Sequence, residues 1–178
     1  MFLEQKDIID ADRDEVYKVV RDRLDVITPY LPNVEKIEVK ERKELEDGKV
    51  FVINNWFAKV DIPAIAEKFI KKELFSWKDT ATWDNDNYKV EYQLESFWAA
   101  NLYTAKGTNY FNKTADGKTE VIVTCDVTIY ADRVPGVPKF LVSKVLPSIE
   151  GMIKKILSPN LGALGSGLKQ YFSQHENS

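Results

Sequence analysis

The sequence has 178 residues, of which 44% are apolar and 12% aromatic, enough to form the core of one folded domain. Disordered chains bury too little apolar surface to offset the entropy of folding, so that class is excluded. The formal charge of -3 and isoelectric point near 5.4 lack the positive charge that attracts phosphates, and we expect no nucleic-acid partner. Charged opening residues and a single cysteine, Cys125, lead us to expect a cytoplasmic protein.

The N-terminal region predicts a strand followed by an amphipathic helix. Residues 2–9 mix apolar and polar side chains like an opening strand, and Asp12 with Glu15 three residues later is typical of a helix N-terminus. Apolar residues then recur at helical spacing until Pro29, which lacks a backbone N–H donor and ends the pattern. The helix therefore has one apolar face, which we expect to pack on another element.

The middle of the chain predicts a run of antiparallel strands joined by hairpins. Beyond Asn33 the hydrophobic period changes to two, and turns at Asp47-Gly48 and Asp116-Gly117 separate successive strands. A short helical pattern over residues 61–70 interrupts the run. The predicted strands are residues 2–9, 34–46, 49–59, 74–84, 88–96, 102–113 and 119–130.

A long amphipathic helix is predicted near the C-terminus. Pro135 and Pro138 suit its first turn, and the wide apolar stripe that follows is broad enough to cover a sheet. We expect Pro159 to end this helix and three glycines to loosen a further helical segment, residues 161–172. Because this segment combines apolar side chains with weak helix propensity, we interpret it as a lid over a cavity opening.

This order of elements resembles the helix-grip fold of the START-like superfamily, also called SRPBCC. The segment with Tyr30, Pro32 and Val34 is similar to the aromatic-x-Pro-x-Val motif that often leads into the second strand of polyketide cyclase-like members. The stretch from Ile62-Pro63-Ala64 to Trp83 is similar to an insert of a poorly characterised bacterial branch. The resemblance thus covers nearly the whole chain.

The resemblance implies an α+β fold in which a curved antiparallel sheet wraps around a long C-terminal helix. It implies a single START-like ligand-binding domain over residues 1–178, with residues 161–178 as a C-terminal extension. In such proteins the space between sheet and helix commonly holds a lipid, a polyketide or a similar hydrophobic molecule. A hydrophobic small-molecule ligand is therefore the partner that we expect.

Strand alternation supplies a candidate lining for this cavity. Alternate strand residues face the same side, so Trp77, Asp79 and Trp83 share one face. Large aromatic residues also commonly fill cores, and Asp79 is either a polar anchor for a ligand or a residue bonded to nearby backbone. The residues that we predict to contact a ligand are Trp56, Trp77, Asp79, Trp83, Tyr92, Tyr103, Asn109, Leu141, Val145, Ile149 and Met152.

The sequence offers little material for catalysis. His175 is the only histidine, so no histidine-based triad and no multi-histidine metal site can be assembled. Cys125 lies among apolar residues and is typical of a small core side chain. The glycines of residues 161–167 do not follow a strand, as a dinucleotide-binding turn would. We predict no catalytic residue, no metal and no cofactor.

Three hypotheses for function remain open. The first is binding or transport of a hydrophobic molecule, and the second is a polyketide cyclase or aromatase-like enzyme in which Asp79 or Tyr92 steers proton transfer. The third is a protein-binding module that partners a chaperone. In addition, Lys154, Lys155 and Lys169 make the C-terminal region basic, which is typical either of a solvated helix face or of peripheral membrane contact.

Overall fold

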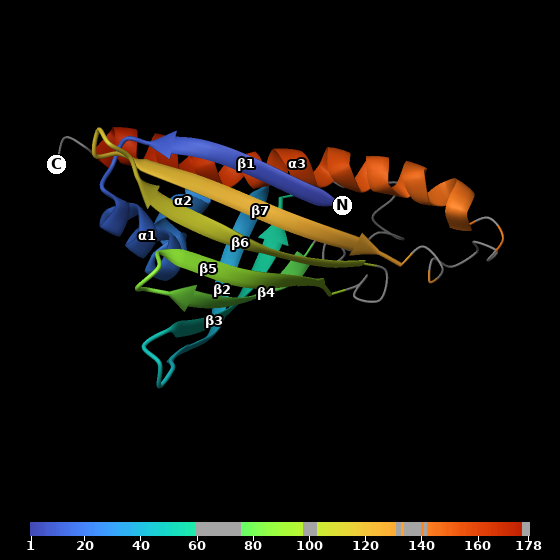
Figure 1. Ribbon diagram of the computed structural model, residues 1–178, viewed down its shortest axis with the longest axis horizontal. Coiled ribbons are helices and arrows are strands. Elements are labelled where there is room, and N and C mark those ends of the chain that lie inside the picture. The colour runs from blue at the N-terminus through green and yellow to red at the C-terminus, as the bar shows by residue number, and fades with distance from the viewer. Residues whose placement is uncertain (60–75, 98–102, 131–132, 134–139, 141, 176–178) are drawn as a thin grey trace.

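A computed structural model describes residues 1–59, 76–97, 103–130, 133, 140 and 142–175, and within these ranges the chain forms one seven-stranded antiparallel sheet and one long helix (Figure 1). The predicted helix over 61–70 lies outside the described residues. The elements are β1 Phe2–Ile9, α1 Arg13–Asp22, α2 Leu24–Ile27, the 3-10 turn η1 Thr28–Tyr30, β2 Val34–Glu44, β3 Val50–Ala58, β4 Ser76–Asp84, β5 Lys89–Ser96, β6 Tyr103–Lys113, β7 Thr119–Ile129 and α3 Val142–His175.

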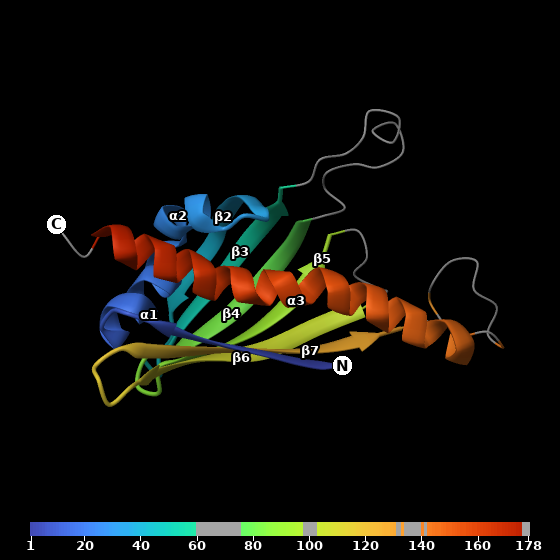
Figure 2. The ribbon, with the colours of Figure 1, turned by 90° about the horizontal axis from the view of Figure 1, so that it is seen from above.

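The sheet has the strand order β1-β7-β6-β5-β4-β3-β2, so β2 to β7 follow one another as neighbours and β1 pairs with the last of them. Gly48 and Gly117 adopt positive φ angles of 78° and 83° in the two predicted hairpin turns, where glycine carries no steric penalty. Figure 2 shows α3 crossing one face of the curved sheet, with α1 and α2 beside its C-terminal half. The predicted α+β helix-grip architecture is confirmed.

The predicted N-terminal helix is divided into two. Asp12 caps α1 by accepting a hydrogen bond from the Asp14 N–H, as its position in the sequence indicates. The helical conformation breaks at Arg23, whose N–H donates to Val19 O, and α2 then begins with Leu24. The break leaves Leu24 and Ile27 both buried in the core.

The predicted end of the C-terminal helix at Pro159 is wrong, because α3 continues through this proline to His175. An interior proline costs about 3 kcal/mol, but burial of one leucine contributes roughly 1.5–3 kcal/mol. Leu168 is completely buried, and Leu161 and Leu164 are partly buried against the same core. Tertiary packing of the last turns therefore offsets the local penalty.

Two of the glycines in this part of α3 serve close packing rather than looseness. A side chain at Gly165 would collide with Asp7 of β1, and a Cβ at Gly167 would lie 2.8 Å from Leu31 Cδ2. Gly162, by contrast, has open space around the position of a Cβ. The C-terminal part of α3 is thus held against β1 and η1, and its action as a lid stays a prediction.

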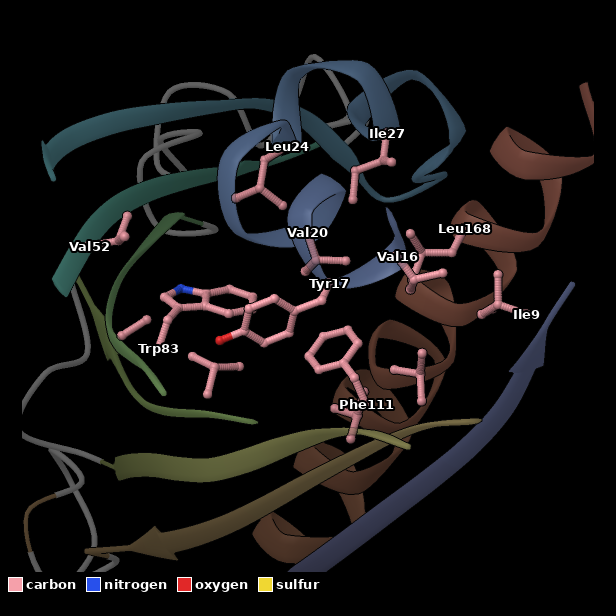
Figure 3. Packing of buried hydrophobic residues seen from close by; sticks show 14 of the residues in the cluster. Ile9, Val16, Tyr17, Val20, Leu24, Ile27, Val52, Trp83, Phe111 and Leu168 are labelled. Carbon is pink, nitrogen blue, oxygen red and sulfur yellow. The ribbon is translucent and has the colours of Figure 1, made fainter. Parts of the chain in front are cut away.

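An aromatic cluster fills one end of the space between the sheet and the helices. Figure 3 shows Tyr17 of α1 between Trp83 of β4 and Phe111 of β6, with residues of α2 and α3 around them. The ring centroids of Tyr17 lie 5.2 Å from Trp83 and 5.3 Å from Phe111, in edge-to-face contacts. The core therefore occupies the end of the sheet that α1 covers.

Candidate functional site

The other end of this space is a pocket of about 390 Å³. Its floor is the inner face of β3 to β7, and its sides come from α1, α2 and the C-terminal part of α3, which Figure 2 shows on the same side of the sheet. Most of its lining is apolar, as in small-molecule binding sites, whose volumes are roughly 300–1,000 Å³. The pocket is thus large enough for a small organic ligand.

The predicted alternation along β4 is confirmed. Trp77, Asp79 and Trp83 line the pocket, whereas Lys78 and Thr80 between them do not. The cause is the period of two in strand geometry, which needs no information beyond the local sequence. Lys78 and Thr80 accordingly lie on the outer face of the sheet.

All seven strand residues of the predicted ligand-contact set border the pocket, although their contact with a ligand stays a prediction. The predicted helix residues are outside what the structure describes, Leu141 entirely and Val145, Ile149 and Met152 for their side chains. The strand residues are Trp56, Trp77, Asp79, Trp83, Tyr92, Tyr103 and Asn109.

Four helix residues that line the pocket, Leu161, Leu164, Val20 and Leu24, are not in the predicted ligand-contact set. Leu161 and Leu164 of α3 line the pocket, but the expected helix end at Pro159 had separated them from the main helix. Val20 and Leu24 also line it, and their helical spacing in the sequence was the available signal. That spacing shows an apolar face without saying which element it meets.

Asp79 is the only charged side chain among the described residues that line the pocket. Part of the residue faces the pocket space, but its Oδ1 atom is buried and has no hydrogen-bond partner within the described chain. Burial disfavours the ionised form and raises the pKa of the Asp79 carboxyl to about 7, and the nearby Trp56 indole lowers it only in part. The carboxyl therefore changes charge near neutral pH.

Three further buried polar atoms of the pocket have no partner among the described residues: Asn54 Oδ1, Trp56 Nε1 and Asn109 Oδ1. Asn54 lies directly across from Asp79 in the β3–β4 pairing, and Trp56 is two residues further along β3. Asn109 is four residues from the row of Asp79, roughly 13 Å along the strands. Buried polar groups without hydrogen-bond partners are rare in native proteins. We therefore expect these atoms to form hydrogen bonds with a molecule that is not part of the chain.

The stacked indoles of Trp56 and Trp77 form an aromatic wall beside Asp79. The two residues are opposite each other on β3 and β4, with ring centroids 5.8 Å apart and planes 12° from parallel. Both side chains are only partly buried and both border the pocket. Both indoles therefore belong to the wall of the pocket beside Asp79.

Tyr92, unlike Asp79, is engaged in the protein's own structure. Its hydroxyl donates a 2.7 Å hydrogen bond to Thr124 O of β7, passing over Gly107 of β6. A Cβ at Gly107 would lie 2.8 Å from the Tyr92 hydroxyl, so the glycine makes room for this bond. Burial also raises the pKa of Tyr92, which keeps it protonated.

Neither a metal centre nor a reactive thiol is visible in the described ranges. No group of three histidine, cysteine, aspartate or glutamate side chains there could hold a metal ion. Cys125 is buried in the pocket wall, and burial raises the pKa of its thiol, which disfavours the nucleophilic thiolate. Among the helices of the described residues, none is long and apolar enough to cross a membrane.

The basic C-terminal region is only partly described. Lys154 is exposed, and Lys169 forms an ion pair with Asp7 of β1. The side chain of Lys155 lies outside the described residues. Membrane contact through these lysines stays a prediction.

Several solved structures are similar to this chain, whereas no protein-family model and no curated protein matches it. The Zhui aromatase/cyclase from Streptomyces shares 17% identity at a TM-score of 0.67 over 96% of this chain and 93% of its own. The di-domain aromatase/cyclase StfQ of the steffimycin pathway shares 12% at 0.70, over 99% of this chain and 52% of its own.

Norcoclaurine synthase from Thalictrum flavum, solved with dopamine and hydroxybenzaldehyde, shares 14% identity at a TM-score of 0.63 over 98% of this chain and 87% of its own. Identities this low establish a common fold and leave the function of each protein separate. The strand order, the position of α3 and these similarities together show that the chain has the helix-grip fold.

Proposed function

We propose that the protein binds a hydrophobic small molecule in the pocket between its sheet and its helices. The observation that carries this proposal is the combination of an apolar lining with four buried polar atoms that lack partners in the described chain: Asn54 Oδ1, Trp56 Nε1, Asp79 Oδ1 and Asn109 Oδ1. An apolar pocket supplies affinity, and a few fixed polar groups supply orientation. A ligand with matching polar groups would remove the cost of leaving these atoms unpaired.

The neutral, environment-sensitive dye Nile red tests this proposal. We expect saturable binding with one dye per chain and native mass spectrometry to detect any compound that copurifies. Ala81→Phe, which projects a ring into the pocket, should abolish dye binding, whereas Thr80→Phe on the outer face of the same strand should preserve it. Absence of saturable dye binding and of any copurified compound would refute the proposal.

A second candidate is an enzyme of the polyketide cyclase or aromatase type. A carboxyl with a pKa near 7 suits general acid–base catalysis at neutral pH, which favours Asp79 over the hydrogen-bonded Tyr92 as the proton-transfer group. Aromatase/cyclases are also among the structures with this fold. Steady turnover of a polyketide-like substrate that disappears in Asp79→Asn would favour the enzyme, and binding without turnover would favour the carrier.

A further inference from the structure

Two buried hydrogen-bond acceptors without partners in the described chain lie at one end of the pocket, together with the indole N–H donor of Trp56. Asn54 Oδ1 and Asp79 Oδ1 come from directly paired residues, and both are buried without a partner in the described chain. The indoles of Trp56 and Trp77 stand beside them. A neutral apolar ligand would leave these acceptors unpaired.

No counter-charge for Asp79 comes from the described part of the pocket lining. Lysine, arginine and histidine are all absent from these residues, and the ionisable neighbours are Tyr92, Tyr103 and Cys125. Burial raises the pKa of each of these three groups, so all of them are neutral when Asp79 ionises. An ionised Asp79 would therefore be an uncompensated buried charge, which is costly.

We infer that the ligand of this pocket is an apolar molecule with an ammonium group, held by the Asp79 carboxylate and the Asn54 carbonyl beside the indoles of Trp56 and Trp77. An ammonium group has several N–H donors and a positive charge, so it satisfies both acceptors and neutralises the carboxylate. Aromatic faces add cation–π attraction, which is strongest for indole and grows when water is excluded. This inference rests on the proposed binding function and specifies its ligand class.

Octylamine and octanol form a matched pair of probes, since they have the same apolar chain and differ in charge. At pH 8 we expect isothermal titration calorimetry to show octylamine binding at least tenfold more tightly than octanol. Asp79→Asn keeps the shape of the side chain and should reduce this preference to about twofold or less. Glu91→Gln removes an equal charge from the outer face of β5 and should leave the preference intact.

The pH dependence separates an anchoring role from a merely structural one. Octylamine stays protonated near neutrality, as lysine side chains do, and its binding should release protons because it favours the ionised form of Asp79. Its affinity should therefore rise between pH 6 and pH 8 in the wild type and stay level in Asp79→Asn. Octanol affinity should not rise with pH in either protein.

Equal affinity for the two probes, or an amine preference that survives in Asp79→Asn, would overturn the inference. Saturable Nile red binding without any octylamine binding would also overturn it, while leaving the proposed function in place. If Nile red too fails to bind to the folded wild type and no compound copurifies with it, the proposed function itself is wrong. Circular dichroism of each variant checks that a loss of binding does not come from unfolding.

Discussion

The two ends of β4 carry the same residue type in two different surroundings. Trp83 is only 5% exposed and packs against Tyr17 and Phe111, so it belongs to the core although it also borders the pocket (Figure 3). Trp77, six residues earlier on the same face, stacks on Trp56 and borders the pocket. Whether an inward-facing tryptophan fills a core or forms a pocket wall depends on what lies opposite it.

The difference comes from the position of α1 over the sheet. This helix brings Tyr17 into edge-to-face contact with Trp83, and its neighbour Val20 marks the border between core and pocket. Asn54 and Asp79 lie in the open part, near Trp77. The filled end therefore stabilises the fold, and we assign ligand binding to the open end.

Replacing Trp83 and Trp77 one at a time would test this comparison of the two ends of β4. These substitutions should give the largest change in the free energy of unfolding. Trp83→Ala should lower the free energy of unfolding by about 3–5 kcal/mol, the usual cost of deleting a large buried aromatic side chain. Trp77→Ala should lower it by about 1 kcal/mol, close to the contribution of one aromatic pair. Urea unfolding followed by circular dichroism measures both values. Equal losses would mean that the two ends are equally filled.

The pH dependence of stability probes the open end through Asp79. Its pKa is raised to about 7 in the folded protein, so the folded state keeps a proton that the unfolded state releases near pH 4. Stability attributable to this residue should therefore fall as pH rises from about 4 to about 7, by on the order of 4 kcal/mol, and then stay level.

Asp79→Asn does not titrate, so the stability difference between wild type and variant isolates this effect. Wild type should lose stability relative to Asp79→Asn between pH 4 and pH 7, as measured by urea unfolding at each pH. Glu91→Gln, an exposed site, serves as the control and should show no comparable trend. A difference that is constant with pH would show that the Asp79 carboxyl is not desolvated.

The sequence predicted the strands and the direction of their side chains because both follow from local alternation. Asp79 faces inward for the same reason as Trp77 and Trp83, through a period that can be read within a few residues. Its pairing with Asn54 depends on strand register, which is set by residues far apart in the chain. The sequence therefore predicted that Asp79 faces inward, but it did not predict the polar site that Asp79 forms with Asn54.

The end of α3 could not be predicted from local propensity because distant contacts decide it. Pro159 and the glycines that follow argue against a helix by local rules. The residues that they meet, Asp7 and Leu31, lie more than a hundred positions earlier in the chain. Close approach to these residues requires glycine, a reason that becomes visible only in the folded structure.

The smallest expected change in the free energy of unfolding comes from α3, where this helix flanks the open end of the pocket. Gly162 and Gly165, three residues apart, provide a matched pair of substitutions. Gly162→Ala adds a methyl group in open space and should raise the free energy of unfolding by about 1 kcal/mol through helix propensity. Gly165→Ala gains the same propensity but forces a collision with Asp7, so it should lower that free energy by about 1–3 kcal/mol. Thermal and urea unfolding measure the opposite signs. Stabilisation by both substitutions would mean that α3 does not pack closely on β1 at Gly165. That result would support the interpretation of residues 161–172 as a lid.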